Sequence, residues 1–250
     1  MSWTDAAIAL VAGLCGGTIN TVVGSGTLIT FPVLLALGLP PVTANVTNTV
    51  GLFPGSFVGA YGYRAELVGQ RRRLLTLGAA TVVGSLVGAS LLLTLPETAF
   101  ETVVPMLIGL ALVLVVVGPR LTARRRADDR SLGRGTAVAL VAVAGLGAVY
   151  GGYFGAAQGV LMLGFLGLLL AEDLQRLNAL KNLLVGTTNC VAAIVFAATA
   201  DVRWGIAGCV TLGAIAGGFL GARLGRRLPP VVLRGGIVVI GAIAIVVLVT

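Results

Sequence analysis

The chain has no histidine and few charged side chains. Charged residues make up 10% of its 250 residues, whereas hydrophobic residues make up 57%. A typical soluble domain carries about 25% charged residues. The composition therefore excludes an ordinary soluble domain and predicts an all-α, polytopic membrane protein embedded in a lipid bilayer.

Cysteine and acidic residues are also scarce. Cys15, Cys190 and Cys209 lie in apolar stretches, with no spacing typical of disulfides or metal ligands. We therefore expect no metal site and no cofactor. No aspartate or glutamate lies in the middle of an apolar stretch, which argues against a metal cation as ligand and against a proton relay of carboxylates. The N-terminus lacks a basic region, so we predict no cleaved signal peptide.

Ten apolar stretches follow one another along the chain. They run at about 5–23, 26–38, 42–62, 74–95, 100–118, 136–154, 159–171, 174–200, 204–224 and 230–250. A membrane-spanning helix needs about 20 residues. Stretches 26–38 and 159–171 are too short, so we expect them to be half-length or re-entrant helices.

The two halves of the chain look like copies of one sequence. An ungapped offset of 133 residues pairs Gly26 with Gly159, Asn45 with Asn178, Gly84 with Gly217 and Pro96 with Pro229. This pattern predicts a first transmembrane repeat over 1–118, a basic linker over 119–135 and a second repeat over 136–250. Glycine-rich faces at 84–89 and 217–222 fit packing within one chain or between two chains of a homodimer.

The arginines predict how the chain is oriented. Most lie in three polar segments, 64–73, 119–134 and 223–234, which share one side of the membrane if the stretches alternate. Loops rich in basic residues face the cytoplasm, so we expect the linker to be cytoplasmic and both termini outside. The +8 net charge is thus a topology signal and predicts no nucleic-acid partner.

This orientation makes the two repeats inverted relative to each other. Loop 62–73 falls inside, whereas its equivalent near 195–206 falls outside. The arrangement is consistent if each short helix forms a re-entrant hairpin with the helix before it. Inverted repeats with interrupted helices are typical of secondary transporters, which bind substrate between the repeats.

A polar face occurs at equivalent positions of both repeats. It comprises Asn45, Asn48, Thr49 and Ser56 in the first repeat, and Asn178, Lys181, Asn182 and Asn189 in the second. A polar face toward lipid is costly, so both should face protein or a water-filled cavity. The amides could instead link helices by hydrogen bonds, and Lys181 could reach the membrane surface. The matched positions favour a substrate site at the centre.

A glycine-rich break precedes each short stretch. The first reads NTVVGSGTLITFP (20–32) and its equivalent reads YFGAAQGVLMLGF (153–165). The candidate binding residues here are Asn20, Gly24, Ser25, Gly26, Gln158 and Gly159. Glycine lets a backbone approach a ligand, and a helix N-terminus attracts anions. We expect the two N-termini to converge near the midplane; tight helix crossing is the alternative.

These groups together predict a small anion as the ligand. An inside-negative potential favours anion exit by about 2.3 kcal/mol per charge for each 100 mV, so an exporter needs no coupling ion. The alternatives are an anion channel, an uptake permease for another small anion, and an intramembrane enzyme with Ser25 and Lys181 as nucleophile and base. The enzyme would lack a histidine or mid-membrane carboxylate to orient that pair.

Two segments carry a family resemblance. The strings GGTINTVVGSGTLITFPVLLALGLPPVTANVTNT and GGYFGAAQGVLMLGFLGLLLAEDLQRLNALKNLL resemble the two repeats of the TauE/SafE family of sulfite exporters. The resemblance implies a multipass plasma-membrane protein that transports sulfite, another sulfur oxyanion or an organosulfonate. By position, it implies a site that includes Asn20, Ser25, Asn45, Asn48, Gln158, Asn178, Lys181 and Asn182.

Overall fold

The computed structural model describes residues 1–123 and 134–224, and within them every regular element is helical. The helices are α1 (Trp3–Val22), α2 (Thr27–Ala36), α3 (Pro41–Gly62), the 3-10 helix η1 (Arg64–Leu67), α4 (Arg71–Thr94), α5 (Glu97–Ala123), α6 (Arg134–Tyr153), α7 (Gln158–Leu169), α8 (Leu174–Thr199) and α9 (Trp204–Leu224). The all-α prediction is confirmed. The expected stretch 230–250 and most of the linker lie outside the described residues.

Helix lengths separate spanning helices from short ones. Helices α1, α4, α6, α8 and α9 are long and apolar enough to cross a membrane. Helices α2 and α7 have 10 and 12 residues, which confirms the two predicted short helices. At 1.5 Å per residue neither can cross a hydrocarbon core about 30 Å thick. The chain is thus a multi-pass membrane protein with two short helices inside it.

Local sequence sets the limits of the first helices. Ser2 and Asp5 form a capping box at the start of α1. Gly38, at φ 82°, ends α2 in a left-handed conformation that favours glycine. Pro41 then opens α3 at a position where a proline removes no needed hydrogen bond. The short segment 37–40 is therefore enough to connect α2 to α3.

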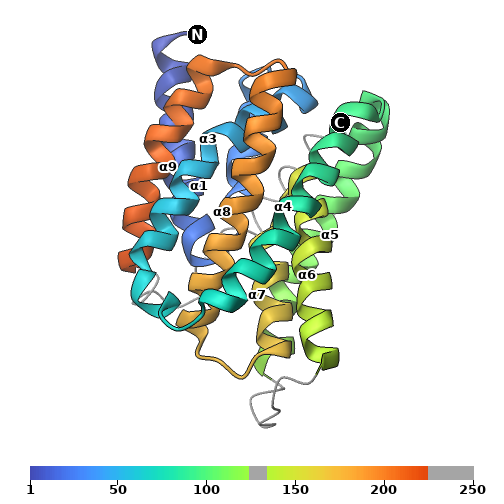
Figure 1. Cartoon of the computed structure of the whole chain (residues 1–250). Coiled ribbons are helices and arrows are strands. Elements are labelled where there is room, and N and C mark those ends of the chain that lie inside the picture. The colour runs from blue at the N-terminus through green and yellow to red at the C-terminus, as the bar shows by residue number, and fades with distance from the viewer. Residues whose placement is uncertain (124–133, 225–250) are drawn as a thin grey trace.

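The internal repeat is visible in the helices themselves. The 133-residue offset carries Pro41, the first residue of α3, onto Leu174 of α8, and carries Arg71 of α4 onto Trp204 of α9. In Figure 1, α1 runs down from the end of the molecule that holds the N-terminus, and α2 returns toward that end. Helix α6 runs up from the opposite end and α7 returns to it. The two hairpins are therefore inverted.

Helix packing follows the same symmetry. Helix α1 packs along α9, and its equivalent α6 packs along α4, while α3 and α8 contact each other between these pairs. Glycines allow the close approach. A Cβ on Gly88 would lie 2.1 Å from the Val149 carbonyl oxygen, and one on Gly217 would lie 2.2 Å from that of Leu14. The glycine-rich faces at 84–89 and 217–222 are therefore used within one chain.

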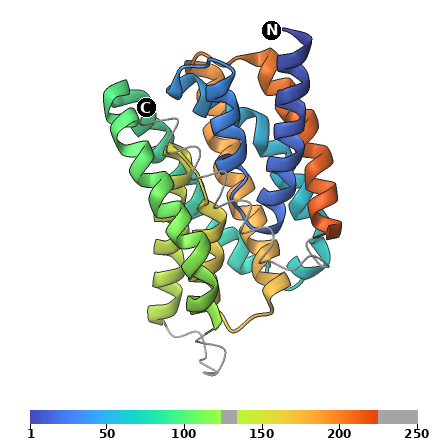
Figure 2. The ribbon, with the colours of Figure 1, turned by 180° about the vertical axis from the view of Figure 1, so that it is seen from behind.

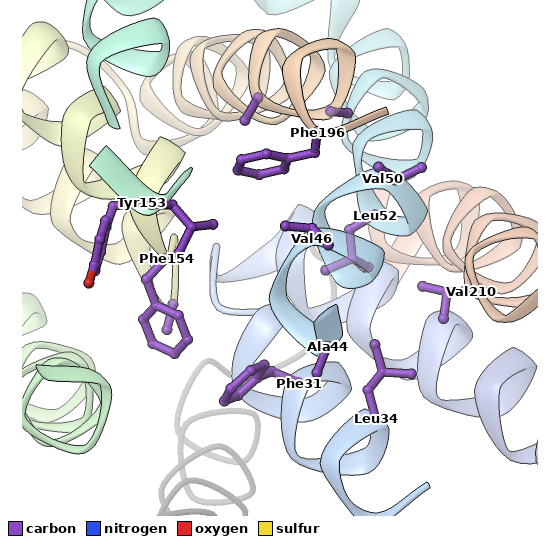
Figure 3. Packing of buried hydrophobic residues seen from close by; sticks show 14 of the residues in the cluster. Phe31, Leu34, Ala44, Val46, Val50, Leu52, Tyr153, Phe154, Phe196 and Val210 are labelled. Carbon is purple, nitrogen blue, oxygen red and sulfur yellow. The ribbon is translucent and has the colours of Figure 1, made fainter. Parts of the chain in front are cut away.

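The apolar core joins the two repeats. Its main cluster includes Phe31 of α2, Val46 of α3, Phe154 after α6 and Phe196 of α8 (Figure 3). The rings of Phe31 and Phe154 meet edge to face with centroids 5.2 Å apart. Aromatic pairs of this kind contribute about 0.5–1.5 kcal/mol beyond their buried area. The end of α6 is thus packed against the first repeat's short helix.

Candidate substrate site between the repeats

The two glycine-rich breaks touch at their backbones. Gly159 N donates a hydrogen bond to Gly24 O at 3.0 Å. A Cβ on Gly24 would lie 2.4 Å from Gly159 Cα, and the reverse substitution would be equally close. The beginnings of α2 and α7 therefore converge, as the sequence predicted. We call this contact the crossing.

Gly24 and Ala157 are equivalent under the repeat and share an unusual backbone. Gly24 has φ 91° and Ala157 has φ 56°. Ala157 is the one non-glycine residue with positive φ in the described chain. Such a conformation costs an L-residue roughly 1–2 kcal/mol. Both breaks thus keep the same left-handed turn, although only the first uses glycine for it.

Lys181 of α8 is completely buried, and its side chain reaches the end of α1. Its Nζ donates to Asn20 O at 3.1 Å and to Thr21 O at 3.2 Å. These carbonyls belong to the last turn of α1, where the helix dipole is negative. Lys181 is 0% exposed, so the alternative in which it reaches the membrane surface is wrong.

Two amides of α8 bind the end of α1 as well. Asn182 Nδ2 donates to Thr21 O at 3.1 Å, and Asn178 Nδ2 donates to it at 3.3 Å. The polar face of α8 in the second repeat thus holds the end of α1 in the first. Asn178, Lys181 and Asn182 therefore link two helices by hydrogen bonds, which was the alternative to a substrate site. The bonds lie at the interface between the repeats, where the substrate site was predicted.

The first repeat makes the equivalent contact only in part. Asn45 Nδ2 donates to Tyr153 O at 2.9 Å, so it caps the end of α6 as Asn178 caps the end of α1. Thr49 instead bonds within its own helix, to Asn45 O. Asn48, the equivalent of Lys181, turns to α2 and bonds Thr27 and Thr30. A positive charge is therefore present at only one of the two helix ends.

Asn20 and Gly26 support the first break. Asn20 Nδ2 donates to Ser56 Oγ at 2.9 Å, and Gly26 N lies 3.5 Å from Asn20 Oδ1. A Cβ on Gly26 would lie 2.4 Å from Gly16 O. The start of α2 is thus pressed against α1 and tied to α3.

Gln158 anchors the second break to α8. Its Nε2 donates to Thr188 Oγ1 at 3.0 Å, and Ser85 Oγ of α4 donates to Thr188 O at 2.7 Å. Sequence reasoning missed Thr188, although it lies seven residues after Lys181 and so on the same helix face. It also missed Thr21 and Tyr153, which contribute backbone carbonyls and leave no side-chain signal.

Several buried polar atoms at this interface accept no hydrogen bond from any described residue. They are Thr21 Oγ1, Ser25 Oγ, Asn45 Oδ1, Gln158 Oε1 and Asn178 Oδ1. Because Ser25 Oγ has no partner, the Ser25–Lys181 pair required by the enzyme alternative is not formed. The structure thus brings ten of the twelve predicted residues to the crossing and the ends of α1 and α6, whereas Asn48 bonds α2 and Thr49 bonds within α3.

Comparison with known proteins identifies the family. The sequence model of the sulfite exporter TauE/SafE family matches residues 9–248. This chain belongs to that family. The "Probable membrane transporter protein YfcA" of Escherichia coli K12 is 31% identical over 216 residues, which covers 86% of this chain and 77% of the relative. A "Probable membrane transporter protein" of Haemophilus influenzae is 25% identical over 218 residues, with 87% and 84% covered. No solved structure matches.

The TauE/SafE assignment makes the chain a member of a membrane transporter family. Among the described residues, no three His, Cys, Asp or Glu side chains gather as metal ligands. A separate cavity of about 440 Å³ opens at the end that holds the N-terminus, lined by Asp5, Leu37–Pro40 and Asp201–Ile206 among others. None of the predicted binding residues lines this cavity, so it is distinct from the crossing.

Proposed function

We propose that this TauE/SafE protein carries a small anion, namely sulfite or a related sulfur oxyanion or organosulfonate, through the interface between its repeats. The buried ammonium of Lys181 carries this proposal. No carboxylate of the described chain lies within 4.0 Å of it, so its charge faces neutral carbonyls alone. An uncompensated buried charge is costly, and a bound anion would compensate it.

The geometry of Lys181 leaves capacity for a ligand. An ammonium has three N–H donors, and the carbonyls of Asn20 and Thr21 accept from two of them. The third donor supports binding of an oxyanion without loss of the existing contacts. Because the donor and the carbonyls belong to different repeats, relative movement of the repeats would change the anion's surroundings, as alternating access requires.

The distribution of charge supports export. The starts of η1, α4 and α8, which carry Arg64, Arg71–Arg73 and Arg176, lie at one end of the molecule. The start of α5, which carries Glu97, and the connection from α8 to α9, which carries Asp201, lie at the other (Figure 1). We place the basic end in the cytoplasm of a cell with an inside-negative membrane potential, because basic loops stay inside. An anion then leaves down its electrical gradient without a coupling ion.

Flux measurements with Lys181→Met test the proposal. Purified protein in proteoliposomes should move sulfite, and the variant should lose at least about a hundredfold in rate, because removing one member of a buried ionic contact costs roughly 3–5 kcal/mol. Arg176→Met removes a positive charge from the surface end of the same helix and should keep most of the flux. Wild-type flux in Lys181→Met would contradict the role of Lys181.

Two further readouts separate the alternatives. Single-channel currents would indicate an anion channel, whereas saturable slow flux indicates a carrier. Lys181 is the only lysine of the chain. An amine-directed reagent can therefore react only with Lys181 and the N-terminal amine, and it reports the accessibility of Lys181. Sulfite should slow modification of Lys181. Unchanged modification at saturating sulfite would place the anion elsewhere.

A further inference from the structure

Three buried amide oxygens at the interface between the repeats accept no hydrogen bond from any described residue. Asn45, Gln158 and Asn178 are each no more than 6% exposed, and each has an amide oxygen that no described residue pairs. An unpaired buried polar group is costly, because it has lost its hydrogen bonds to water. Three such oxygens around one contact indicate a ligand that donates hydrogen bonds, whereas a simple anion only accepts them.

The orientation of the Gln158 amide has a chemical reason. An amide can rotate by 180° and exchange its oxygen and nitrogen, so its hydrogen-bond partners decide which atom faces them. Thr188 Oγ1 donates its one proton to Leu184 O at 3.1 Å, and therefore can only accept from Gln158. In this arrangement the NH2 group faces Thr188, which leaves Oε1 as the free atom.

The same argument holds for the two asparagines. Asn45 faces the carbonyl of Tyr153, and Asn178 faces the carbonyl of Thr21. A carbonyl oxygen can only accept a hydrogen bond, so both amides must present nitrogen to it. Their oxygens are therefore the free atoms.

Ser25 and Gln158 are the chain neighbours of the two glycines that form the crossing. Ser25 follows Gly24 and Gln158 precedes Gly159, so both flank the hydrogen bond between those glycines. Each side chain is 1% exposed. The Ser25 hydroxyl can donate to an anion, and Gln158 Oε1 can only accept. Lys181 holds the carbonyls of Asn20 and Thr21 just before the same break.

We propose that the transported anion also carries a hydrogen-bond donor: a protonated or hydroxyl-bearing oxyanion whose O–H group binds Gln158 Oε1 while Ser25 and Lys181 bind its negative oxygens. This inference rests on the proposed function and narrows its substrate class. An anion capped by an alkyl group leaves Oε1 unpaired in the complex. Such an analogue loses the hydrogen bond and is discriminated against.

Two sulfonates of similar shape test this preference. Hydroxymethanesulfonate carries a hydroxyl where ethanesulfonate carries a methyl group. In proteoliposomes of the wild-type protein, the hydroxyl compound should be transported at least about tenfold faster at limiting concentration, since roughly 1.4 kcal/mol corresponds to a factor of ten. Equal rates would overturn the inference and leave anion transport standing. If neither sulfonate nor sulfite moves, the proposed function falls as well.

A matched pair of variants assigns the preference to one atom. Gln158→Met removes Oε1 and the bond to Thr188 together, whereas Thr188→Val removes the bond and keeps the oxygen. The preference should fall to less than about threefold in Gln158→Met and persist in Thr188→Val. Loss of the preference in both variants to the same extent would overturn the role of Oε1. The wild-type comparison stands even if one variant does not fold.

Discussion

Ala157 and Gly24 show how one backbone conformation is met by two different residues. Both occupy the same position of the repeat and both have positive φ. At Gly24 a side chain would meet Gly159 Cα at 2.4 Å, so glycine is required by space as well as by conformation. Ala157 has room for its methyl group, and the strain is the only cost. The second break therefore differs from the first in strain rather than in shape.

Replacing Ala157 with glycine should relieve this strain. The left-handed conformation costs alanine roughly 1–2 kcal/mol, and glycine loses about 0.5–1 kcal/mol in entropy, so a small net gain is expected. Thermal unfolding in detergent measures it. Ala156→Gly is the control, because Ala156 is equally buried and its φ is not positive, so it should lose stability. A loss at both positions would show that the strain at Ala157 is negligible.

Helix pairs α1–α9 and α4–α6 depend on glycine at the contact. In lipid the hydrophobic effect does not drive helices together, so close packing of small residues matters more. The Gly88 backbone lies directly against the Val149 carbonyl, whereas a Cβ on Gly78 of the same helix would meet nothing within 4 Å. One helix thus carries both a tight and an open glycine.

Gly88→Ala should push α4 away from α6. The added methyl group would lie 2.1 Å from a carbonyl oxygen, and overpacking of this kind costs about 1–3 kcal/mol or more. Gly78→Ala should stabilise α4 slightly, by up to about 1 kcal/mol of helix propensity. Unfolding of both variants in the same detergent gives the comparison. Equal stability of the two variants would mean that the α4–α6 contact has room for a methyl group at position 88.

At the scale of the whole molecule, an ion pair joins the repeats at the basic end. Glu172, before α8, accepts from Arg73 of α4 at 2.9 Å and from Arg176 at 2.7 Å. Burial by itself raises the pKa of Glu172, but the hydrogen bond from Arg73 and the charge of Arg176 outweigh it, so the pKa is lowered. A glutamate with a lowered pKa stabilises the fold above its unfolded pKa and loses that effect as pH falls through the folded pKa.

Glu172→Gln should therefore destabilise the protein at neutral pH and not in acid. The expected loss is about 1 kcal/mol or less at pH 7, since the groups are partly exposed. It should begin to shrink as pH falls below the ordinary glutamate pKa of about 4.3, and disappear below the lowered pKa of Glu172 in the folded protein. Asp173→Asn changes the same charge at a side chain with no capping hydrogen bond, and should change the melting temperature less. A deficit that persists at low pH would exclude an ionic cause.

The proposed orientation, with the basic end in the cytoplasm, predicts which loops can be labelled from outside. Val68, after η1, is 72% exposed at the basic end, and Glu97 opens α5 at the other end. Figure 2 shows these two ends from behind. In a cysteine-free background, a membrane-impermeant maleimide should label Glu97→Cys in intact spheroplasts and Val68→Cys only after permeabilisation. The reverse pattern would invert the topology and the proposed direction of export.

Sequence alone determined the class of the protein, the repeat, the two short helices and the polar faces of α3 and α8. These features are local or periodic, so composition and a constant 133-residue offset are enough to read them. Only the tertiary structure decided that Lys181 binds the carbonyls of Asn20 and Thr21, that Gly24 touches Gly159, and that the amide donors are used while their oxygens stay free. Apart from the bond of Gln158 to Thr188, those contacts join segments at least 108 residues apart. Backbone carbonyls also look alike in every sequence, so no pattern along the chain specifies which of them a side chain will reach.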